Sequence, residues 1–179
     1  MENCQCTDIL YILKRKGINF IAVDFDLTLI SHHTSSQYRG KAKDLVLCIR
    51  PCFSLLIPSL LDNQIGVSIV TFSNQTELIR EVIRLAFPFH WSKIVIRTSD
   101  KSWGDAGDRD RCGKQKYIAS AAEESELLFN IDIARNTTLL IDDQQENIRA
   151  ALRNGVRAIL FLPDNPNSIF ADIVAMGRS

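Results

Sequence analysis

The stretch Phe20-Ile21-Ala22-Val23-Asp24-Phe25-Asp26-Leu27-Thr28-Leu29 decides how the rest of the chain is read. It begins as an apolar strand-like run and ends in two carboxylates separated by one residue. Just past the end of a parallel strand the chain turns, so Asp24 and Asp26 can both reach one crevice. Carboxylates are costly to bury elsewhere. The segment therefore predicts a strand that delivers two acids to a polar site.

Length and charge set the frame for that site. The chain has 179 residues, of which 46% are hydrophobic, and this length favours a single domain over residues 1–179. Its 21 basic and 21 acidic residues give a formal net charge of zero. No global field therefore draws the protein to nucleic acid or to an anionic membrane, and nucleic acid enters only as a candidate substrate. A homo-oligomer stays open.

The cysteines and the amino terminus predict where the protein works. Five cysteines are an odd number, and their spacing matches neither a disulfide framework nor a paired zinc motif: Cys4, Cys6, Cys48, Cys52 and Cys112. Free thiols in a reducing compartment are expected. The amino terminus lacks the pattern of a secretory signal, and no apolar stretch is long enough to span a bilayer. These features predict a soluble cytoplasmic protein.

Apolar strand-like runs alternate with helical ones along the chain. Strands are expected in the run from Phe20 that leads to Asp24 and Asp26, and at 67–71, 93–97, 138–141 and 158–162. Helices are expected from a Thr7 or Asp8 cap through Leu13 with Gly17 ending the helix, at 51–61 with Pro58 kinking or dividing it, and at 75–87, 114–124, 144–154 and 169–176. This alternation implies right-handed parallel crossovers, and hence an α/β fold with a doubly wound, Rossmann-like parallel sheet of about five strands.

Reactive side chains follow three of these strands. Asp24 and Asp26 end the first strand, Thr71 the second, and Asp142 with Asp143 the fourth, while Lys114 opens the helix that leads into the fourth. In a parallel sheet these positions share one rim. Alone, an acidic pair is most often a helix cap, a threonine a turn residue and a lysine a surface charge, but together they indicate a site.

The chemistry of this set is that of phosphoryl transfer. Crowded carboxylates need a cation, and oxygen-only ligands favour Mg²⁺. Asp24 could then attack phosphorus in line and form an aspartyl-phosphate, with Asp26 as the general acid and base. Thr71 and the backbone amides of Phe72 and Ser73 could bind the phosphoryl oxygens, and Lys114 would neutralise charge.

The residues Asp24-Phe25-Asp26-Leu27-Thr28, Thr71, Lys114 and Asp142-Asp143 resemble the motifs of the haloacid dehalogenase-like hydrolase superfamily in order and spacing across most of the chain. The nearest resemblance is to its small capless magnesium-dependent phosphatases. The resemblance implies a nucleophilic Asp24, an acid/base Asp26 whose main-chain carbonyl also contacts Mg²⁺, and a metal site completed by Asp142 and Asp143.

Several assignments stay open within this reading. Asp143 is favoured as the direct metal ligand, with Asp142 direct or water-mediated. Lys116 competes with Lys114, which is chosen by its match to the motif. Asn147 either braces the loop after the fourth strand or is an ordinary helix residue. His32 and His33, in the segment where the family has a mobile flap, either contact substrate or are simply exposed.

Substrate size follows from the intervals between motifs. Thr28 and Thr71 lie 43 positions apart, and Thr71 and Lys114 also 43, which leaves no room for a large cap domain. An open site suits a phosphoprotein, a nucleic-acid end, or a small substrate enclosed by a partner. The loop from Ser99 to Gly113 could form a small lid, in which Trp103 either stacks on substrate or anchors the loop. The alternative function is an idle domain that binds a protein; a dehalogenase is disfavoured because halide leaves without a proton.

Overall fold

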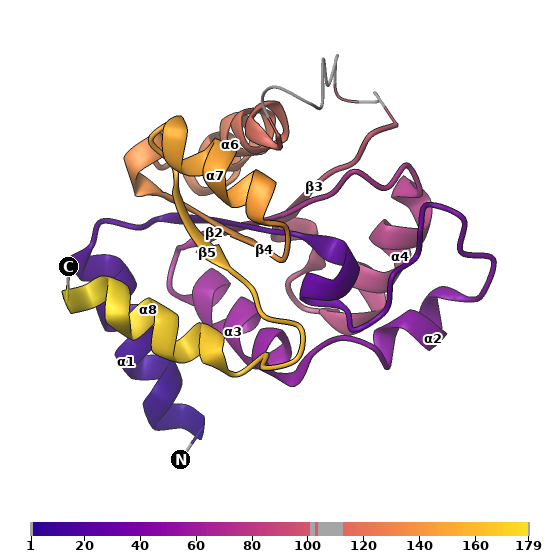
Figure 1. The fold of residues 1–179 in the computed structure, drawn as a ribbon, viewed down its shortest axis with the longest axis horizontal. Coiled ribbons are helices and arrows are strands. Elements are labelled where there is room, and N and C mark those ends of the chain that lie inside the picture. The colour runs from indigo at the N-terminus through magenta and orange to yellow at the C-terminus, as the bar shows by residue number, and fades with distance from the viewer. Residues whose placement is uncertain (1, 101–102, 104–112, 179) are drawn as a thin grey trace.

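Five parallel strands form the sheet at the centre of the molecule (Figure 1). The structure, a computed structural model, describes the backbone of residues 2–100, 103 and 113–178 and the side chains of residues 7–100, 103 and 113–177. The strands are β1 (Phe20–Val23), β2 (Gly66–Val70), β3 (Ile94–Arg97), β4 (Thr138–Asp142) and β5 (Arg157–Leu160). Their order in space is β3-β2-β1-β4-β5, and every pairing is parallel. The predicted fold class is confirmed.

The order of the strands creates a crevice at one edge of the sheet. The chain moves outward from β1 to β2 and β3, then returns to the other side of β1 for β4 and β5. Val23, the last residue of β1, pairs with Ile69 of β2 and Ile141 of β4, so the carboxyl ends of these strands lie level. Ligands of such sheets bind outside the carboxyl ends at the point where the direction reverses. Here that point lies between β1 and β4.

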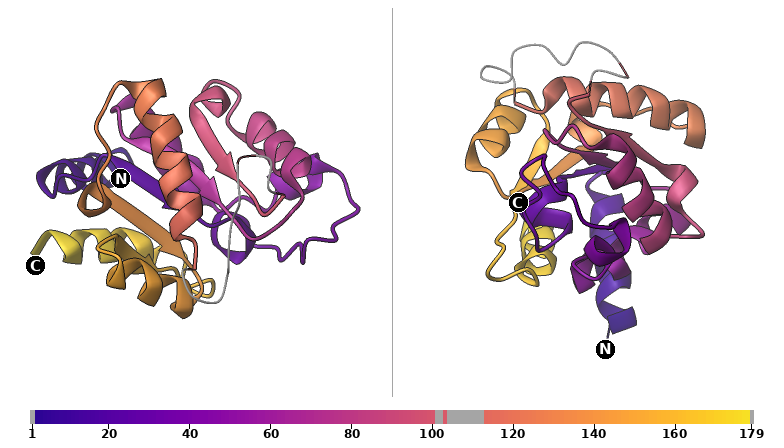
Figure 2. Two further views of the ribbon diagram at one scale, coloured as in Figure 1. Left: turned by 90° about the horizontal axis from the view of Figure 1, so that it is seen from above. Right: turned by 90° about the vertical axis from the view of Figure 1, so that its right-hand side faces the viewer.

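Helices cover both faces of the sheet (Figures 1 and 2). One face carries α1 (Glu2–Arg15), α3 (Pro51–Asp62), α4 (Thr76–Ala86) and α8 (Ser168–Arg178), and the other carries α6 (Gln115–Phe129) and α7 (Gln145–Arg153). Short helical segments join them: η1 (Phe25–Leu29), α2 (Ala42–Val46), η2 (Trp91–Lys93) and η3 (Arg135–Thr137). α1 and α8 lie side by side.

Alternation along the strands divides the core in two. In β1, β2, β4 and β5, odd-numbered residues such as Ile21 and Ile69 pack against the helices of the first face, and even-numbered ones such as Ala22 and Leu140 pack against α6 and α7. The numbering is reversed in β3, where Ile94 packs on the first face and Val95 on the second. Burial of apolar groups on both faces stabilises the sheet and holds its carboxyl edge in place.

Several element boundaries differ from the sequence prediction. α1 begins at Glu2 instead of at a Thr7 or Asp8 cap, because no helix breaker precedes those residues. α3 runs through Pro58 as one helix, since the buried residues on either side of the proline, such as Ile57 and Leu60, hold it against the sheet. α6 continues past Glu124 until Asn130, whose left-handed backbone ends it.

The described residues of the two intervals between motifs add little structure beyond the sheet and its helices. Between Thr28 and Thr71 they form the end of η1, α2, α3 and β2, so this interval holds no cap domain. Between Thr71 and Lys114 the described residues form only α4, η2 and β3. The short α2 has no counterpart in the sequence prediction. Most of the 99–113 loop, together with Cys112 and the side chains of Cys4 and Cys6, lies outside the described residues, whereas Cys48 and Cys52 are free thiols. Within the described chain, no helix combines the length and the apolar character needed to cross a membrane.

Candidate active site

A tight turn after β1 places the first two acids. The Asp24 backbone N–H donates to the Ile141 carbonyl at 2.9 Å, which ties the end of β1 to β4. The next residues form a turn closed by backbone hydrogen bonds from the Leu29 N–H to the Asp24 carbonyl and from the Ile30 N–H to the Phe25 carbonyl, and the backbone of Asp26 and Leu27 inside it is not helical. Inside this turn Leu27 has a φ of +60°, a strained value for a bulky residue. The buried guanidinium of Arg50 donates to the Leu27 carbonyl at 2.9 Å and stabilises this conformation.

Three carboxylates and one ammonium meet at the crevice between β1 and β4. Oxygen atoms of Asp24, Asp142 and Asp143 lie within 4.8 Å of one another. The Lys114 ammonium contacts Asp24 Oδ1 and lies 2.7 Å from Asp142 Oδ2. Lys114 is 2% exposed and Asp142 0% exposed. When all four groups are ionised, the cluster carries a net charge of −2, and three of the four groups, Asp24, Asp142 and Lys114, are buried.

The surroundings change how readily these groups ionise. Burial raises the pKa of Asp24 to about 7; Lys114 opposes this change and the Asp142 carboxylate adds to it. Burial, with a contribution from Asp142, likewise raises the pKa of Asp143. Burial alone would lower the pKa of Lys114, but the carboxylates of Asp24 and Asp142 outweigh it and raise the pKa. Lys114 therefore stays charged. Its single positive charge is shared by the carboxyl groups of Asp24, Asp142 and Asp143.

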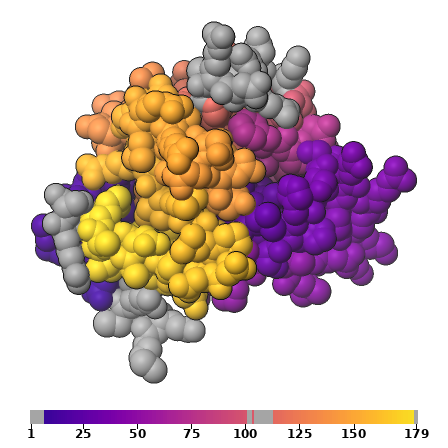
Figure 3. All heavy atoms as spheres, viewed as in Figure 1, coloured from indigo at the N-terminus to yellow at the C-terminus, as the bar shows by residue number. Residues whose placement is uncertain are grey.

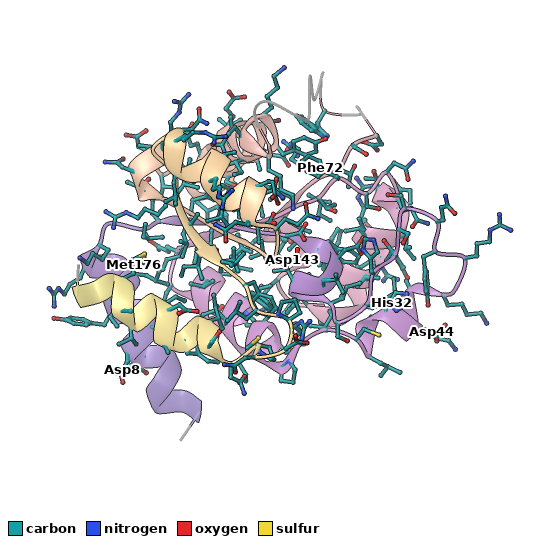
Figure 4. All side chains as sticks on the ribbon, viewed as in Figure 1. Asp8, His32, Asp44, Phe72, Asp143 and Met176 are labelled. Atoms are coloured by element: carbon teal, nitrogen blue, oxygen red, sulfur yellow. The ribbon has the colours of Figure 1, made fainter. Side chains whose placement is uncertain are left out.

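The two acids after β4 have different surroundings. Asp142 accepts hydrogen bonds from the Gln144 backbone N–H at 2.8 Å and from the Asn147 side-chain amide at 3.0 and 3.1 Å. Its carboxylate is thus held by protein groups on both oxygens, and the proposed bracing role of Asn147 matches its contacts. Asp143 is partly exposed and lines the open cavity; Figure 4 labels its side chain near the middle of the molecule.

The carboxylate of Asp26 is held apart from the acidic trio. The Thr34 backbone N–H donates to Asp26 Oδ1 at 3.1 Å and the Thr34 hydroxyl to Oδ2 at 2.9 Å. His33 Nδ1 lies 3.5 Å from the same Oδ2. Asp26 is not among the three clustered carboxylates, so a metal contact from this residue requires its main-chain carbonyl, as the family resemblance implies.

The close approach of Gly113 to helix α7 sets the position of Lys114, the next residue. The preceding residue, Gly113, has a φ of +54°, and a Cβ atom there would lie 3.0 Å from the Ala150 Cβ of α7. Glycine is therefore required to bring the start of α6 against α7. Lys116, the alternative lysine, is exposed on α6, so the structure brings Lys114 and not Lys116 to the carboxylates.

A cavity of about 350 Å³ opens above this cluster. Its described lining brings together the segments after β1, β2 and β4: Asp24, Asp26, Leu27, His33, Ser35, Ser36, Thr71, Phe72, Ser73, Lys114, Asp143 and Gln144. The segment after β1 and the carboxy-terminal third of the chain border each other on this face (Figure 3). Every predicted site residue except the fully buried Asp142 lines this cavity.

The loop after β2 is preorganised by its own hydroxyl. The Ser73 backbone N–H donates to the Thr71 Oγ atom at 3.1 Å, so this amide has a partner within the protein. Because the Thr71 hydroxyl accepts that bond, it can donate its own proton into the cavity. The Thr71 hydroxyl therefore has a better geometry for binding an anion than the Ser73 amide has. The amide holds this hydroxyl in position.

Comparison with known proteins adds information on the fold. No protein-family model matches this chain, and no curated protein matches it. The crystal structure of an uncharacterized protein from Corynebacterium glutamicum ATCC 13032 Kitasato has a TM-score of 0.50 and 13% sequence identity, over 88% of this chain and 96% of that chain. The likeness is one of fold. Membership of the haloacid dehalogenase-like superfamily stays a prediction.

Two residues near the site were not given a role by the sequence. The Thr28 hydroxyl lies 3.4 Å from both Asp24 Oδ2 and Asp143 Oδ1, and its single proton can be donated to only one of them at a time. Thr28 lies inside the acidic motif, so the sequence could have predicted that it is near the site. Thr34 lies in a segment without hydrophobic periodicity, so no sequence pattern indicates its role.

The structure places Trp103, His32 and His33, for which the sequence leaves two roles open. Trp103 Nε1 donates to the Thr98 carbonyl at 2.7 Å, and its ring packs edge-on against Tyr117 at 4.9 Å between centroids. These contacts match the role of an anchor. His32 is exposed and packs against Tyr38 at 5.6 Å, away from the cavity lining, whereas His33 lines the cavity.

Proposed function

We propose that this protein is a magnesium-dependent phosphomonoester phosphatase that works through an aspartyl-phosphate, as a capless member of the haloacid dehalogenase-like superfamily. One observation carries the proposal: Lys114 joins Asp24 to Asp142 beside Asp143, at the reversal point of a parallel sheet. A buried lysine held between a nucleophile and a metal-type carboxylate suits the handling of a phosphate dianion.

The donor set fits a divalent cation. Its atoms are all oxygens, which hard cations such as Mg²⁺ prefer, and the net charge of −2 on the ionised cluster equals the charge that such an ion would neutralise. Asp24, Asp143 and the main-chain carbonyl of Asp26 would hold the ion, with Asp142 direct or through water. When bound, it would screen the repulsion between the nucleophile and the anionic substrate.

The first chemical step uses Asp24 and Asp26. Because Asp24 Oδ1 faces Lys114, Oδ2 is the oxygen available to attack phosphorus in line. The bond between Oδ2 and phosphorus forms while the bond from phosphorus to the leaving oxygen breaks. Asp26 gives its proton to that oxygen, and the product alcohol leaves.

The second step reverses the role of Asp26. As a carboxylate it takes a proton from water, whose oxygen attacks phosphorus, and the bond between phosphorus and Asp24 breaks to release phosphate. Throughout, Lys114 balances the charge on Asp24, and the Thr71 hydroxyl donates to a phosphoryl oxygen. Phe72 and Ser73 form the wall beside that oxygen.

The open cavity limits the substrates to those that need no enclosing cap. A phosphoprotein, a nucleic-acid end or a small substrate enclosed by a partner, including a second copy of this chain, meets that requirement. The free thiols of Cys48 and Cys52 support a cytoplasmic location.

Metal dependence tests the proposal directly. Purified protein is expected to hydrolyse p-nitrophenyl phosphate with Mg²⁺ and to lose at least about 100-fold in rate with a chelator, with recovery on adding Mg²⁺ back. Beryllium fluoride with Mg²⁺, as an analogue of the phosphoryl group, should raise the melting temperature by several degrees. A protein that is inactive on a panel of phosphoproteins, sugar phosphates and nucleotides, and does not respond to the analogue, would instead be an idle binding domain.

Thr34 supplies a test of the acid/base assignment. Thr34→Val removes one of two hydrogen bonds that align Asp26 and is expected to lower kcat for an alkyl phosphate about tenfold. The loss on p-nitrophenyl phosphate should be smaller, because its leaving group scarcely needs a proton. Thr34→Ser keeps the hydroxyl and should restore the rate. Equal losses on both substrates would show that Thr34 acts on folding or binding and not through Asp26.

A further inference from the structure

Strained backbone gathers at the mouth of the cavity. Five described residues other than glycine have a positive φ, and three of them, Leu27, Ser35 and Ser36, line this one cavity. The other two have ordinary places: Gln64 in the turn before β2 and Asn130 at the end of α6. Left-handed backbone at non-glycine residues costs free energy and clusters at functional sites.

Ser35 and Ser36 occupy the centre of one tight turn. Their φ values are +51° and +57°, and the Gln37 N–H donates to the Thr34 carbonyl at 3.0 Å across them. Positive φ at both central residues is the mark of a type I′ turn, where asparagine and glycine are strongly preferred. Two serines are a poor choice for this backbone. The turn itself therefore does not explain them.

Both serines line the cavity. Ser36 is half-buried and Ser35 is exposed, and within the described part of the chain neither hydroxyl makes a hydrogen bond. The residue before them, Thr34, donates hydrogen bonds to both carboxylate oxygens of Asp26. The turn is thus fixed relative to the group that gives a proton to the leaving oxygen. Ser35 and Ser36 line the same cavity as Asp26, so a leaving group held beside Asp26 is within that shared space.

We propose that Ser35 and Ser36 determine substrate specificity by hydrogen bonding to polar groups on the leaving alcohol of the phosphoester. The inference rests on the proposed phosphatase function. A substrate that bears hydroxyls or amides next to the phosphate finds donors and acceptors on the turn, whereas a purely hydrocarbon leaving group does not. The strained backbone places both serines in the cavity lining, at a cost in stability.

Two double variants separate the hydroxyls from the backbone strain. Ser35→Ala/Ser36→Ala removes the hydroxyls and keeps the strain, while Ser35→Gly/Ser36→Gly removes both. The measured quantity is the ratio of kcat/KM for glycerol 1-phosphate to that for n-propyl phosphate, whose leaving groups have the same carbon chain. Both release an alkoxide that needs a proton, so a misaligned Asp26 lowers both rates and leaves the ratio unchanged.

The wild type is expected to favour glycerol 1-phosphate by about tenfold, and both variants should bring the ratio close to one. Only the glycine variant should also melt higher, by roughly 2–4 °C. A wild type that hydrolyses p-nitrophenyl phosphate and both alkyl phosphates without preference, or variants that keep the preference, would overturn this inference and leave the phosphatase proposal standing. A wild type inactive on all three and on the wider substrate panel, and unresponsive to beryllium fluoride, would instead contradict the proposed function.

Discussion

Asp24→Asn is expected to lower kcat for p-nitrophenyl phosphate by on the order of 10⁴- to 10⁶-fold, because an amide oxygen is a far weaker nucleophile than a carboxylate. Asparagine has the shape of aspartate, and Asp24 is 5% exposed in a well-packed turn, so the fold should survive. The control is Asp164→Asn, an exposed carboxylate outside the cavity lining, which should keep full activity.

Trapping the intermediate sharpens this test. Wild-type protein quenched in acid during turnover should carry phosphate bound to Asp24, as detected by mass spectrometry, and Asp24→Asn should carry none. If Asp24→Asn retains more than about a hundredth of the wild-type rate, water attacks phosphorus directly and Asp24 has another role.

The same variant should show a pH-dependent change in stability. The pKa of Asp24 is raised from its ordinary value of 3.8 to about 7, so between these values the folded protein holds a proton that the unfolded chain releases. The stability from this group is present at low pH and is lost as pH rises through 7. Asparagine has no such loss. In metal-free protein, the melting temperature of Asp24→Asn should therefore exceed that of the wild type by several degrees at pH 8.5 and by less at pH 5.5.

Mg²⁺ should reverse that order. The ion binds the carboxylate of the wild type and stabilises the folded state, whereas the amide of Asp24→Asn is a poorer ligand. The difference in melting temperature between the wild type and Asp24→Asn could instead change with neither pH nor Mg²⁺. That result would show that the folded protein does not raise the pKa of Asp24 and that Asp24 is not a metal ligand.

The sheet and the acidic cluster could be predicted because both follow from local pattern. Apolar runs such as that of β4 specify strands, and the parallel topology then brings Asp24, Asp142 and Asp143 to one edge. Periodicity alone does not choose between Lys114 and Lys116, so the prediction of Lys114 relies on its match to a motif. In the structure Lys114 is buried and Lys116 is exposed.

The segment after η1 could not be predicted, for a physical reason. Residues 31–41 have no hydrophobic period, and the turn at Ser35 and Ser36 adopts a backbone that serine disfavours. Propensity therefore indicates the wrong conformation at the place where Thr34 grips Asp26. Tertiary contacts, such as the two hydrogen bonds between Gln75 and Tyr38 at 3.1 and 2.8 Å, hold this segment instead.

Lys114→Met is expected to destabilise the metal-free protein by about 3–5 kcal/mol, because it leaves the carboxylates of Asp24 and Asp142 buried without a counter-charge. For a chain of this size the melting temperature should fall by about 10 °C. Lys116→Met is the matched control: Lys116 is exposed, and its replacement should change stability by no more than about 0.5 kcal/mol. Equal melting temperatures for the two variants would contradict the role given to Lys114.

A double variant shows whether that loss comes from the carboxylates. If unpaired negative charge causes it, Asp24→Asn removes part of the charge that Lys114 balances, so Lys114→Met should cost at least about 1 kcal/mol less in the Asp24→Asn background than in the wild type. Mg²⁺ should likewise recover part of the stability of Lys114→Met, because the ion supplies positive charge to the same acids. Additive losses, unchanged by Mg²⁺, would mean that the lysine stabilises the protein through packing alone. The four groups would then not form one electrostatic unit suited to phosphoryl transfer.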